Sequence, residues 1–408
     1  MLLATGAHTH FSWMLQATLK KKTMTKICLY CKKEKSDEEF SQEHILPRGV
    51  GGNLNTYNPF SINDVCQKCN NLSGLFIDGP FIKSWFINNY RADIAKKYCH
   101  LTDQTILPLT YFGEIEDLKF ENKICEFWLG PTGDTIYHFH EPYPEELDSP
   151  PMVGVPPTAY KKEIDYGFVF LFIRSNNPQW HPAIVLSVMA NFKKSILYLG
   201  NGNKPSIDQF KEIPDELSDL HLKLKDVQGQ THKNSVKIGI NSADRFLCKL
   251  ALGIGSLLLD ESFKESKSAD LLRLGMWTKN RSEREKLPIH GTGLLGNKDS
   301  MANFDNLFKW SGGHAIVVMA TRDRLALYSN FYEVNSSVIQ ISDEPELWKD
   351  KLTEGVVYVV VPPLSKAVGP IKLTEFIAHR IEFDYKNEQL LSLEEQMQQF
   401  TKLPPFDI

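Results

Sequence analysis

Four cysteines near the N-terminus are the residues of this chain whose types and spacing indicate chemistry most clearly. Cys28 and Cys31 form one Cys-x-x-Cys motif, Cys66 and Cys69 form a second, and 34 residues separate the two motifs. Two thiolate pairs at this spacing can supply all four ligands of one tetrahedral zinc ion. Because four sulfur ligands leave no open position for a substrate, we predict that this zinc is structural.

Between the two cysteine pairs, Glu43 and His44 place a carboxylate beside an imidazole, and Asn70 directly follows the last cysteine. An imidazole can accept a proton near neutral pH. A hard divalent cation held by carboxylate and amide oxygens can neutralise the charge that develops on a phosphodiester. A lone Glu-His pair is a weak signal, since most single histidines are structural. Its position between the two cysteine motifs favours a hydrolytic site.

The order of these motifs resembles that of the HNH nucleases, which have the ββα-metal fold, and especially their zinc-knuckle subgroup. The resemblance covers roughly residues 26–80 and is carried by Cys28-x-x-Cys31, Glu43-His44-Ile-Leu-Pro47, Gly51-Gly52-Asn53 and Val65-Cys66-x-x-Cys69-Asn70-Asn71-x-x-Gly74. It implies that His44 is the general base that deprotonates a water, and that Glu43 and Asn70 hold a catalytic Mg²⁺ or Mn²⁺. It implies Zn²⁺ on the four cysteines, and cleavage that leaves a 5′-phosphate and a 3′-hydroxyl.

One position departs from the family pattern. The family places a middle asparagine about five residues before the third cysteine, where this chain has Ser61. Asn58 and Asn63 are both near enough in sequence to orient the loop, and the sequence does not choose between them.

Composition divides the chain into four segments, and we predict an α+β protein. Residues 1–23 are expected to be a disordered extension, 24–100 a zinc-stapled HNH domain with a packing helix, and 101–157 an irregular Pro-rich connection. Residues 158–408 are expected to form a larger mixed α+β domain of unknown topology that regulates the nuclease or recognises its target. Apolar runs of strand length predict strands at 123–129, 166–174, 183–189, 195–199, 315–320, 324–328 and 356–361. Helical spacing predicts helices at 81–100, 242–263 and 393–400, the last with Ser392 and Glu395 as a capping box.

Charge and cysteine content indicate which binding partners and which cellular compartment to expect. The net charge is −4, but residues 1–100 carry a small positive excess, so any contact with a polyanion is expected there. Seven cysteines, only four of them paired in motifs, favour metal thiolates and buried thiols in a reducing cytoplasm. No apolar run reaches the roughly 18 residues of a membrane helix. We therefore expect a cytoplasmic protein with a nucleic-acid partner, DNA being favoured, no membrane partner, and a protein partner or oligomer formed through the C-terminal domain.

The sequence thus indicates a metal-dependent endonuclease, and the resemblance makes a role in bacterial defence or in a mobile element plausible. The alternative is a non-catalytic zinc-knuckle module that binds nucleic acid or protein, in which His44 is only structural. The missing middle asparagine is its best support.

Several other groups of residues allow weaker interpretations. His138, His140 and Glu141 could bind a metal from one strand, although a solvated strand end is favoured. Cys99 and His100 with Cys125 could form a further zinc site. The basic side chains Arg48, Lys68 and Lys83 could hold phosphate oxygens or simply be solvated. The aromatic side chains Phe81, Trp85 and Phe86 could stack on bases, although core packing is favoured for them.

Overall fold

The computed structural model describes residues 25–52, 54, 58–99, 101–102, 104–142, 167–201, 210–236, 240–292, 298–381 and 384–400. The expected extension at 1–23 and most of the expected proline-rich segment at 141–157 lie outside these residues. Within the described part of the chain, no helix is both long and apolar enough to cross a membrane.

The N-terminal unit consists of two short antiparallel hairpins followed by helices. β1 (Thr25–Ile27) pairs with β2 (Glu34–Ser36), and β3 (Phe40–His44) pairs with β4 (Ser61–Cys66), both antiparallel. α1 (Gln67–Ser73) follows, and a π-helical turn (Gly74–Asp78) leads into α2 (Gly79–Ile82) and α3 (Trp85–Lys97). The loop after His44 folds back so tightly that a Cβ on Gly52 would lie 1.9 Å from the Leu46 carbonyl oxygen, so only glycine fits there.

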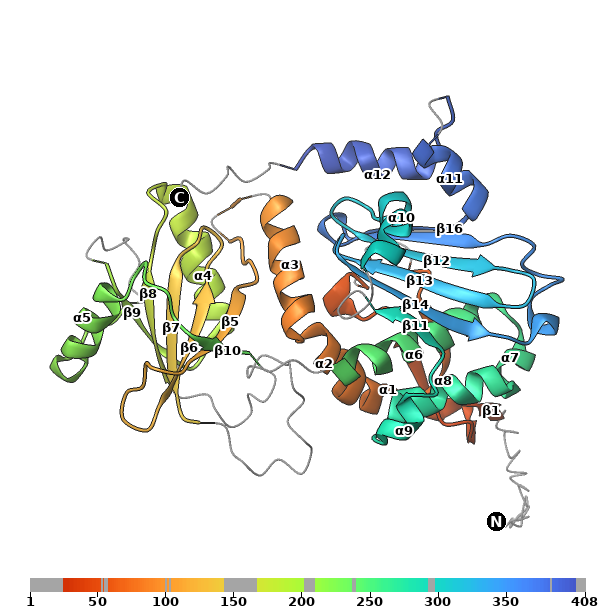
Figure 1. The fold of residues 1–408 in the computed structure, drawn as a ribbon, viewed down its shortest axis with the longest axis horizontal. Coiled ribbons are helices and arrows are strands. Elements are labelled where there is room, and N and C mark those ends of the chain that lie inside the picture. Colours follow the sequence, from red (N-terminus) through yellow and green to blue (C-terminus); the bar gives the residue numbers. More distant parts are fainter. Residues whose placement is uncertain are drawn as a thin grey trace, which may run out of the picture.

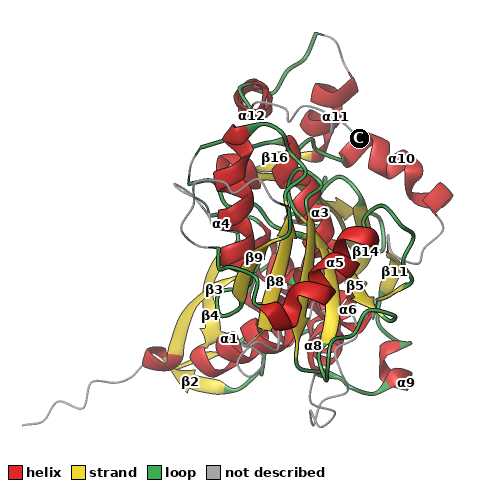
Figure 2. Cartoon of the chain, turned by 90° about the vertical axis from the view of Figure 1, so that its left-hand side faces the viewer, coloured by secondary structure: helices red, strands yellow, loops and turns green. Residues whose placement is uncertain are grey.

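A first six-stranded sheet lies in a separate lobe, on the left in Figure 1. Its strand order is β10-β5-β6-β7-β8-β9, and only β8 and β9 are parallel. The strands are β5 (Thr110–Ile115), β6 (Ile124–Leu129), β7 (Thr135–His140), β8 (Gly167–Phe172), β9 (Ile196–Leu199) and β10 (Asn234–Ser235). α4 (His181–Asn191) and α5 (Ser218–Asp226) pack on opposite faces, and Figure 2 shows α5 across the near face of the strands.

A second six-stranded sheet, entirely antiparallel, forms the core of the other lobe in the order β11-β14-β13-β12-β15-β16. The strands are β11 (Ile289–Thr292), β12 (His314–Ala320), β13 (Leu325–Phe331), β14 (Asn335–Ser342), β15 (Val356–Val361) and β16 (Lys366–Lys372). Its helices are α6 (Ile240–Leu258), α7 (Glu261–Glu265), α8 (Lys267–Trp277), α9 (Arg281–Arg284), α10 (Lys298–Phe308), α11 (Leu373–Ile381) and α12 (Glu388–Gln398).

Both faces of this second sheet are buried, which explains the continuous apolar runs in its strands. Along β12, Ile316 and Val318 join a core that includes α6 and α8, whereas Ala315 and Val317 join one with α10, α11 and α12. Figure 1 shows the two groups of helices on opposite sides of the sheet.

The N-terminal unit shares a hydrophobic core with α6 and the second sheet. Phe81 of α2 stacks on Phe246 of α6 with ring centroids 3.7 Å apart and planes inclined by 8°. Ile45, which directly follows β3, belongs to the same buried cluster. The N-terminal unit and α6 are therefore in direct contact, although about 170 residues separate Phe81 from Phe246 in the sequence.

Three of the sequence-based expectations need correction. The segment 101–157 is not an irregular connection throughout, because β5, β6 and β7 occupy 110–140, and 158–408 is divided between the two lobes. Residues 183–189 belong to helix α4 and not to a strand, because a short apolar run has no period that separates a strand from a buried helix. α12 begins earlier than predicted, with Asn387 as the N-cap that accepts from the Gln389 and Leu390 N–H groups.

Candidate active site and zinc centre

The four motif cysteines converge on one point. Cys28 and Cys31 flank the turn between β1 and β2, Cys66 ends β4, and Cys69 lies in the first turn of α1. Their sulfur atoms all lie within 4.8 Å of one another. Zinc–sulfur bonds of about 2.3 Å require sulfur separations of about 3.8 Å in a tetrahedral site. The donors therefore fit a zinc ion closely, and the predicted cysteine cluster is confirmed.

The backbone around the cluster is arranged to support the thiolates. The Cys66 N–H donates to the Cys28 sulfur at 3.3 Å. The Leu29 N–H donates to the Asp64 carbonyl oxygen at 2.8 Å, which ties the first knuckle to β4. These contacts hold the two cysteine pairs together, although 34 residues separate the pairs in the sequence.

β3 presents Glu43 and His44 on opposite sides because successive side chains of a strand alternate. Glu43 is 2% exposed and faces the core, whereas His44 is partly exposed. The register pairs His44 with Ser61 and Glu43 with Ile62. The imidazole can therefore reach a bound substrate, while the carboxylate lies beneath the strand.

The surroundings of His44 favour its neutral, proton-accepting form. Partial burial and the positive charges of Arg48 and Lys249 lower the pKa of His44 below its usual 6.5, and Glu43 opposes this shift. A histidine with a lowered pKa is unprotonated at neutral pH, as a general base must be.

Asn70 fixes the strand that carries Glu43 and His44. Its Nδ2 donates to the Gln42 carbonyl oxygen at 2.9 Å and to the Ser41 hydroxyl oxygen at 3.0 Å. These bonds hold the start of α1 against β3 and leave the amide oxygen, Oδ1, as the part of Asn70 that can bind a cation.

The loop between β3 and β4 is braced by Asn58. Its Nδ2 donates to the Gly52 carbonyl oxygen at 3.1 Å, and its Oδ1 accepts from the Phe60 N–H at 2.9 Å. Asn63, the other candidate for the missing middle asparagine, is exposed on β4. Of the two candidates, Asn58 is thus the one that orients the loop.

Glu43 has a partner that the sequence did not predict. Lys249 on α6 is fully buried, and its Nζ lies 2.7 Å from Glu43 Oε1 and 2.7 Å from Asp78 Oδ2. The same Nζ donates to the His44 carbonyl oxygen at 3.1 Å. The Tyr30 hydroxyl donates to Glu43 Oε1 at 3.0 Å. An ammonium group from the C-terminal region therefore lies directly beneath the Glu43-His44 pair.

Asp78 completes this buried cluster. Burial raises the pKa of Asp78 to about 6, although the ammonium group of Lys249 opposes the shift. Sequence signals for this cluster were present but weak: Lys249 interrupts the apolar face of α6 between Cys248 and Leu250, and a buried lysine requires a carboxylate partner.

The weaker candidates have mostly structural surroundings. Phe81 is buried in the core, and Trp85 donates through Nε1 to the Tyr111 carbonyl oxygen at 2.8 Å. Cys99 and Cys125 lie in different hydrophobic clusters, which excludes a shared zinc site, and His100 lies outside the described residues. The basic side chains Arg48, Lys68 and Lys83 are all exposed.

These features define a ββα unit clamped by thiolates, with a partly exposed histidine on its second hairpin. Residues 28–86 match a family model described as HNH endonuclease, so the chain carries an N-terminal HNH domain followed by a larger α+β region. No curated protein and no solved structure matches the chain.

Proposed function

We propose that this protein is a metal-dependent endonuclease that hydrolyses nucleic-acid phosphodiester bonds, with His44 as the general base. The observation that carries this proposal is the environment of His44, a partly exposed imidazole with a lowered pKa on the β3–β4 hairpin of an HNH domain, next to the four-cysteine cluster. Its neutral nitrogen would take the proton of a water that attacks phosphorus.

The catalytic Mg²⁺ or Mn²⁺ would bind oxygen donors from Asn70 and Glu43. Both contacts of the Glu43 carboxylate described above fall on Oε1, which leaves Oε2 for an ion. The amide oxygen of Asn70 is the second donor, and hard cations prefer such carboxylate and amide oxygens. When bound, the ion would supply positive charge to the phosphate and the leaving oxygen.

Lys249 would position Glu43 for this role. Its ammonium group neutralises a carboxylate that would otherwise be buried alone, and it also binds the backbone of His44. The C-terminal region would in this way control the geometry of the nuclease site, which suits the regulatory role expected for it.

A nucleic-acid substrate, with DNA favoured, agrees with the charge at the surface. Arg48 and Lys68 are exposed on the same unit as His44 and could contact phosphate oxygens. None of the seven cysteines, all of which lie among the described residues, forms a disulfide, which suits a reducing cytoplasm. A protein partner or an oligomer would act through the C-terminal region.

The alternative function is a zinc module that binds nucleic acid without cutting it. The burial of Glu43 against Lys249 favours this alternative, because an ion pair can replace a metal ligand set. Binding without strand scission is its distinguishing property.

The two functions are separated by incubating purified full-length protein with supercoiled plasmid and measuring both binding and nicking. We expect nicking in Mg²⁺ or Mn²⁺ that EDTA abolishes, its loss in His44→Ala, and its retention in His290→Ala, a matched change of an exposed histidine on β11. A gel shift without nicking of plasmid, single-stranded DNA or RNA in either metal would establish the alternative. Equal nicking by His44→Ala and the wild type would overturn the assignment of the base.

A further inference from the structure

A second cluster of metal-binding side chains lies in the other lobe, remote from the HNH domain in the sequence. Glu126 on β6 pairs directly with His138 on β7, and His140 is two residues further along the same strand face. All three side chains are buried, with exposures of 1%, 3% and 0%. The solvated strand end expected from the sequence is therefore not what the structure has.

The donor atoms of the three side chains converge. His138 Nδ1 lies 3.7 Å from one oxygen of Glu126, and His140 Nε2 lies 3.6 Å from the other. One donor atom from each residue lies within 4.8 Å of those from the other two. Metal–ligand bonds of about 2.0 to 2.1 Å place tetrahedral donors about 3.3 Å apart, so only a small contraction is needed.

The outer nitrogen of each imidazole is held by an oxygen atom. His140 Nδ1 lies 2.8 Å from the Glu141 carbonyl oxygen, and His138 Nε2 lies 3.1 Å from the Ser195 hydroxyl. Because a carbonyl oxygen only accepts, His140 Nδ1 donates its hydrogen to Glu141, and Nε2 is the ring nitrogen that faces Glu126. Metal-binding histidines are oriented in the same way by oxygens beyond the metal.

The carboxylate is also oriented from its far side. The Tyr111 hydroxyl donates to one Glu126 oxygen and Trp128 Nε1 donates to the other, each at 3.3 Å. The rings of His138 and Phe192, the residue that directly follows α4, lie 4.5 Å apart. The two imidazoles and the carboxylate are thus contacted by residues on β5 and β6 and by loop residues next to β7, α4 and β9.

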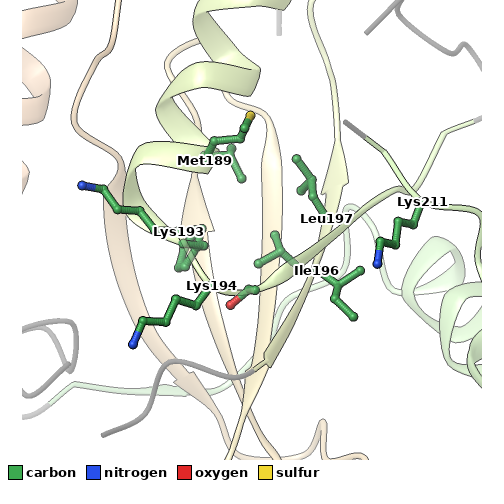
Figure 3. A pocket seen from close by; sticks show the side chains of 10 residues that line it. Met189, Lys193, Lys194, Ile196, Leu197 and Lys211 are labelled. Carbon is green, nitrogen blue, oxygen red and sulfur yellow. The ribbon is translucent and has the colours of Figure 1, made fainter. Parts of the chain in front are cut away.

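A pocket lies beside this cluster. Ser195, the partner of His138, is one of the residues that line a pocket of about 260 Å³ between α4 and β9. Figure 3 shows Met189 and Leu197 on its apolar part, with Lys193 and Lys194 extending outward. Only one side chain therefore separates the outer nitrogen of His138 from this pocket.

We propose that Glu126, His138 and His140 form a second metal site that binds one Zn²⁺-class ion and joins β6 to β7. Two imidazole nitrogens and one carboxylate oxygen are a donor set that zinc accepts. This site is independent of the HNH domain, and neither its existence nor its test depends on nuclease activity.

The test is the zinc content of the purified full-length protein after dialysis against metal-free buffer, measured by mass spectrometry. We expect about two zinc ions per chain in the wild type, one from each donor set. Glu126→Gln and His140→Gln should each lower this content to about one, because each removes one of only three protein ligands. Glu141→Gln is the matched control, since its side chain is exposed and only its backbone carbonyl contacts His140.

Cobalt substitution separates the two sites. Co²⁺ bound to the four thiolates gives intense sulfur-to-metal charge-transfer absorption, which Glu126→Gln should leave unchanged while it loses one cobalt equivalent. A wild-type content of about one zinc ion, held only by the cysteines, would overturn the proposal and leave a hydrogen-bonded Glu–His–His cluster. That wild-type result would overturn the proposal even if the variants fail to fold, whereas a content of about two is assigned to this site by its loss in Glu126→Gln and His140→Gln.

Discussion

At the scale of single residues, the neighbours Glu43 and His44 on β3 have different surroundings. Alternation along β3 leaves His44 partly exposed while it buries Glu43 against Lys249 and Tyr30. A base needs access to water and substrate, whereas a carboxylate that is held by a lysine needs a fixed geometry. The same strand can supply both only because consecutive side chains point in opposite directions.

The lowered pKa of His44 predicts the pH dependence of strand scission. The proposed role of His44 as general base requires its neutral form, so the acid limb of the single-turnover rate should have its midpoint below pH 6.5. Arg48→Gln removes one positive charge that lowers this pKa, so its midpoint should move to higher pH. Arg322→Gln, a change in a turn that is distant in sequence from the HNH domain, serves as the control. A midpoint above pH 6.5 in the wild type, or no movement in Arg48→Gln, would contradict this environment.

At the scale of elements, zinc is expected to hold the β1–β2 turn against the end of β4 and the start of α1. Cys66→Ser should lose zinc and unfold the N-terminal unit, because structural zinc in small units contributes about 10–16 kcal/mol of apparent binding energy. Cys99→Ser, a matched change of a buried thiol outside the cluster, should keep its zinc. Metal analysis and thermal unfolding check both variants, and a folded Cys66→Ser protein with an unchanged zinc content would refute the staple.

Helix α6 contributes Lys249 to the nuclease unit, which gives a second prediction at this scale. Lys249→Met should lower the free energy of unfolding by about 3–5 kcal/mol, because it leaves the Glu43 and Asp78 carboxylates without their cation. Lys264→Met is the control: its partners Asp64 and Glu261 are 35% and 84% exposed, so its loss should cost about 1 kcal/mol or less.

The double variant Glu43→Gln/Lys249→Met tests whether the two residues act as a pair. It should be more stable than the sum of the single changes predicts, because Glu43 is then no longer an unpaired buried charge, and Asp78 loses its cation in the single and the double variant alike. Denaturant unfolding of the four proteins gives the coupling free energy, and a value near zero would show that the ion pair has no part in the stability of the unit.

Features with a local signal in the sequence were predicted correctly, whereas features that depend on tertiary contacts were missed. The four-cysteine cluster and the strand at 356–361 follow from spacing and local pattern. The apolar run at 183–189 became a helix because α4 is buried on one face of a sheet whose existence the sequence did not reveal. Lys249 could be recognised as unusual on an apolar helix face, but its partners are about 170 to 200 residues away, and no periodicity connects them.

At the scale of the whole molecule, the HNH domain contacts both helix α8 and the sheet of the C-terminal lobe. Lys32 pairs with Asp270 at 2.8 Å, and Arg273 Nε donates to the Leu29 carbonyl oxygen at 2.6 Å. His314 on β12 contacts the loop between β3 and β4, with its Nε2 2.7 Å from the Val50 carbonyl oxygen. The HNH domain is thus built onto the C-terminal lobe, so a change in that lobe can reach the loop that follows His44.

His314 gives this connection a measurable pH dependence. Burial lowers the pKa of His314 to about 4, because the imidazole is fully enclosed. As the pH falls from 6.5 to 4, the unfolded chain takes up a proton that the folded protein cannot accept, so about 3 kcal/mol of stability is lost. Above pH 6.5 both states are neutral, and this residue contributes no pH dependence.

Unfolding free energies of the wild type and His314→Gln between pH 4 and 7 test this prediction. The variant should lose less stability than the wild type over this range, whatever its stability at pH 7. His221→Gln, which changes a partly exposed histidine that also contacts a backbone carbonyl, should keep the wild-type slope. Parallel slopes for the wild type and His314→Gln would show that groups other than His314 cause the loss of stability at acidic pH.

The role of His44 as the general base is tested by the single-turnover rate of plasmid nicking by His44→Ala at neutral pH in Mg²⁺, with DNA binding measured in parallel. Removing a general base should slow scission by a factor of about 10² to 10⁴ and leave binding nearly unchanged. A His44→Ala protein that cuts as fast as the wild type would contradict the assignment of His44 as the general base.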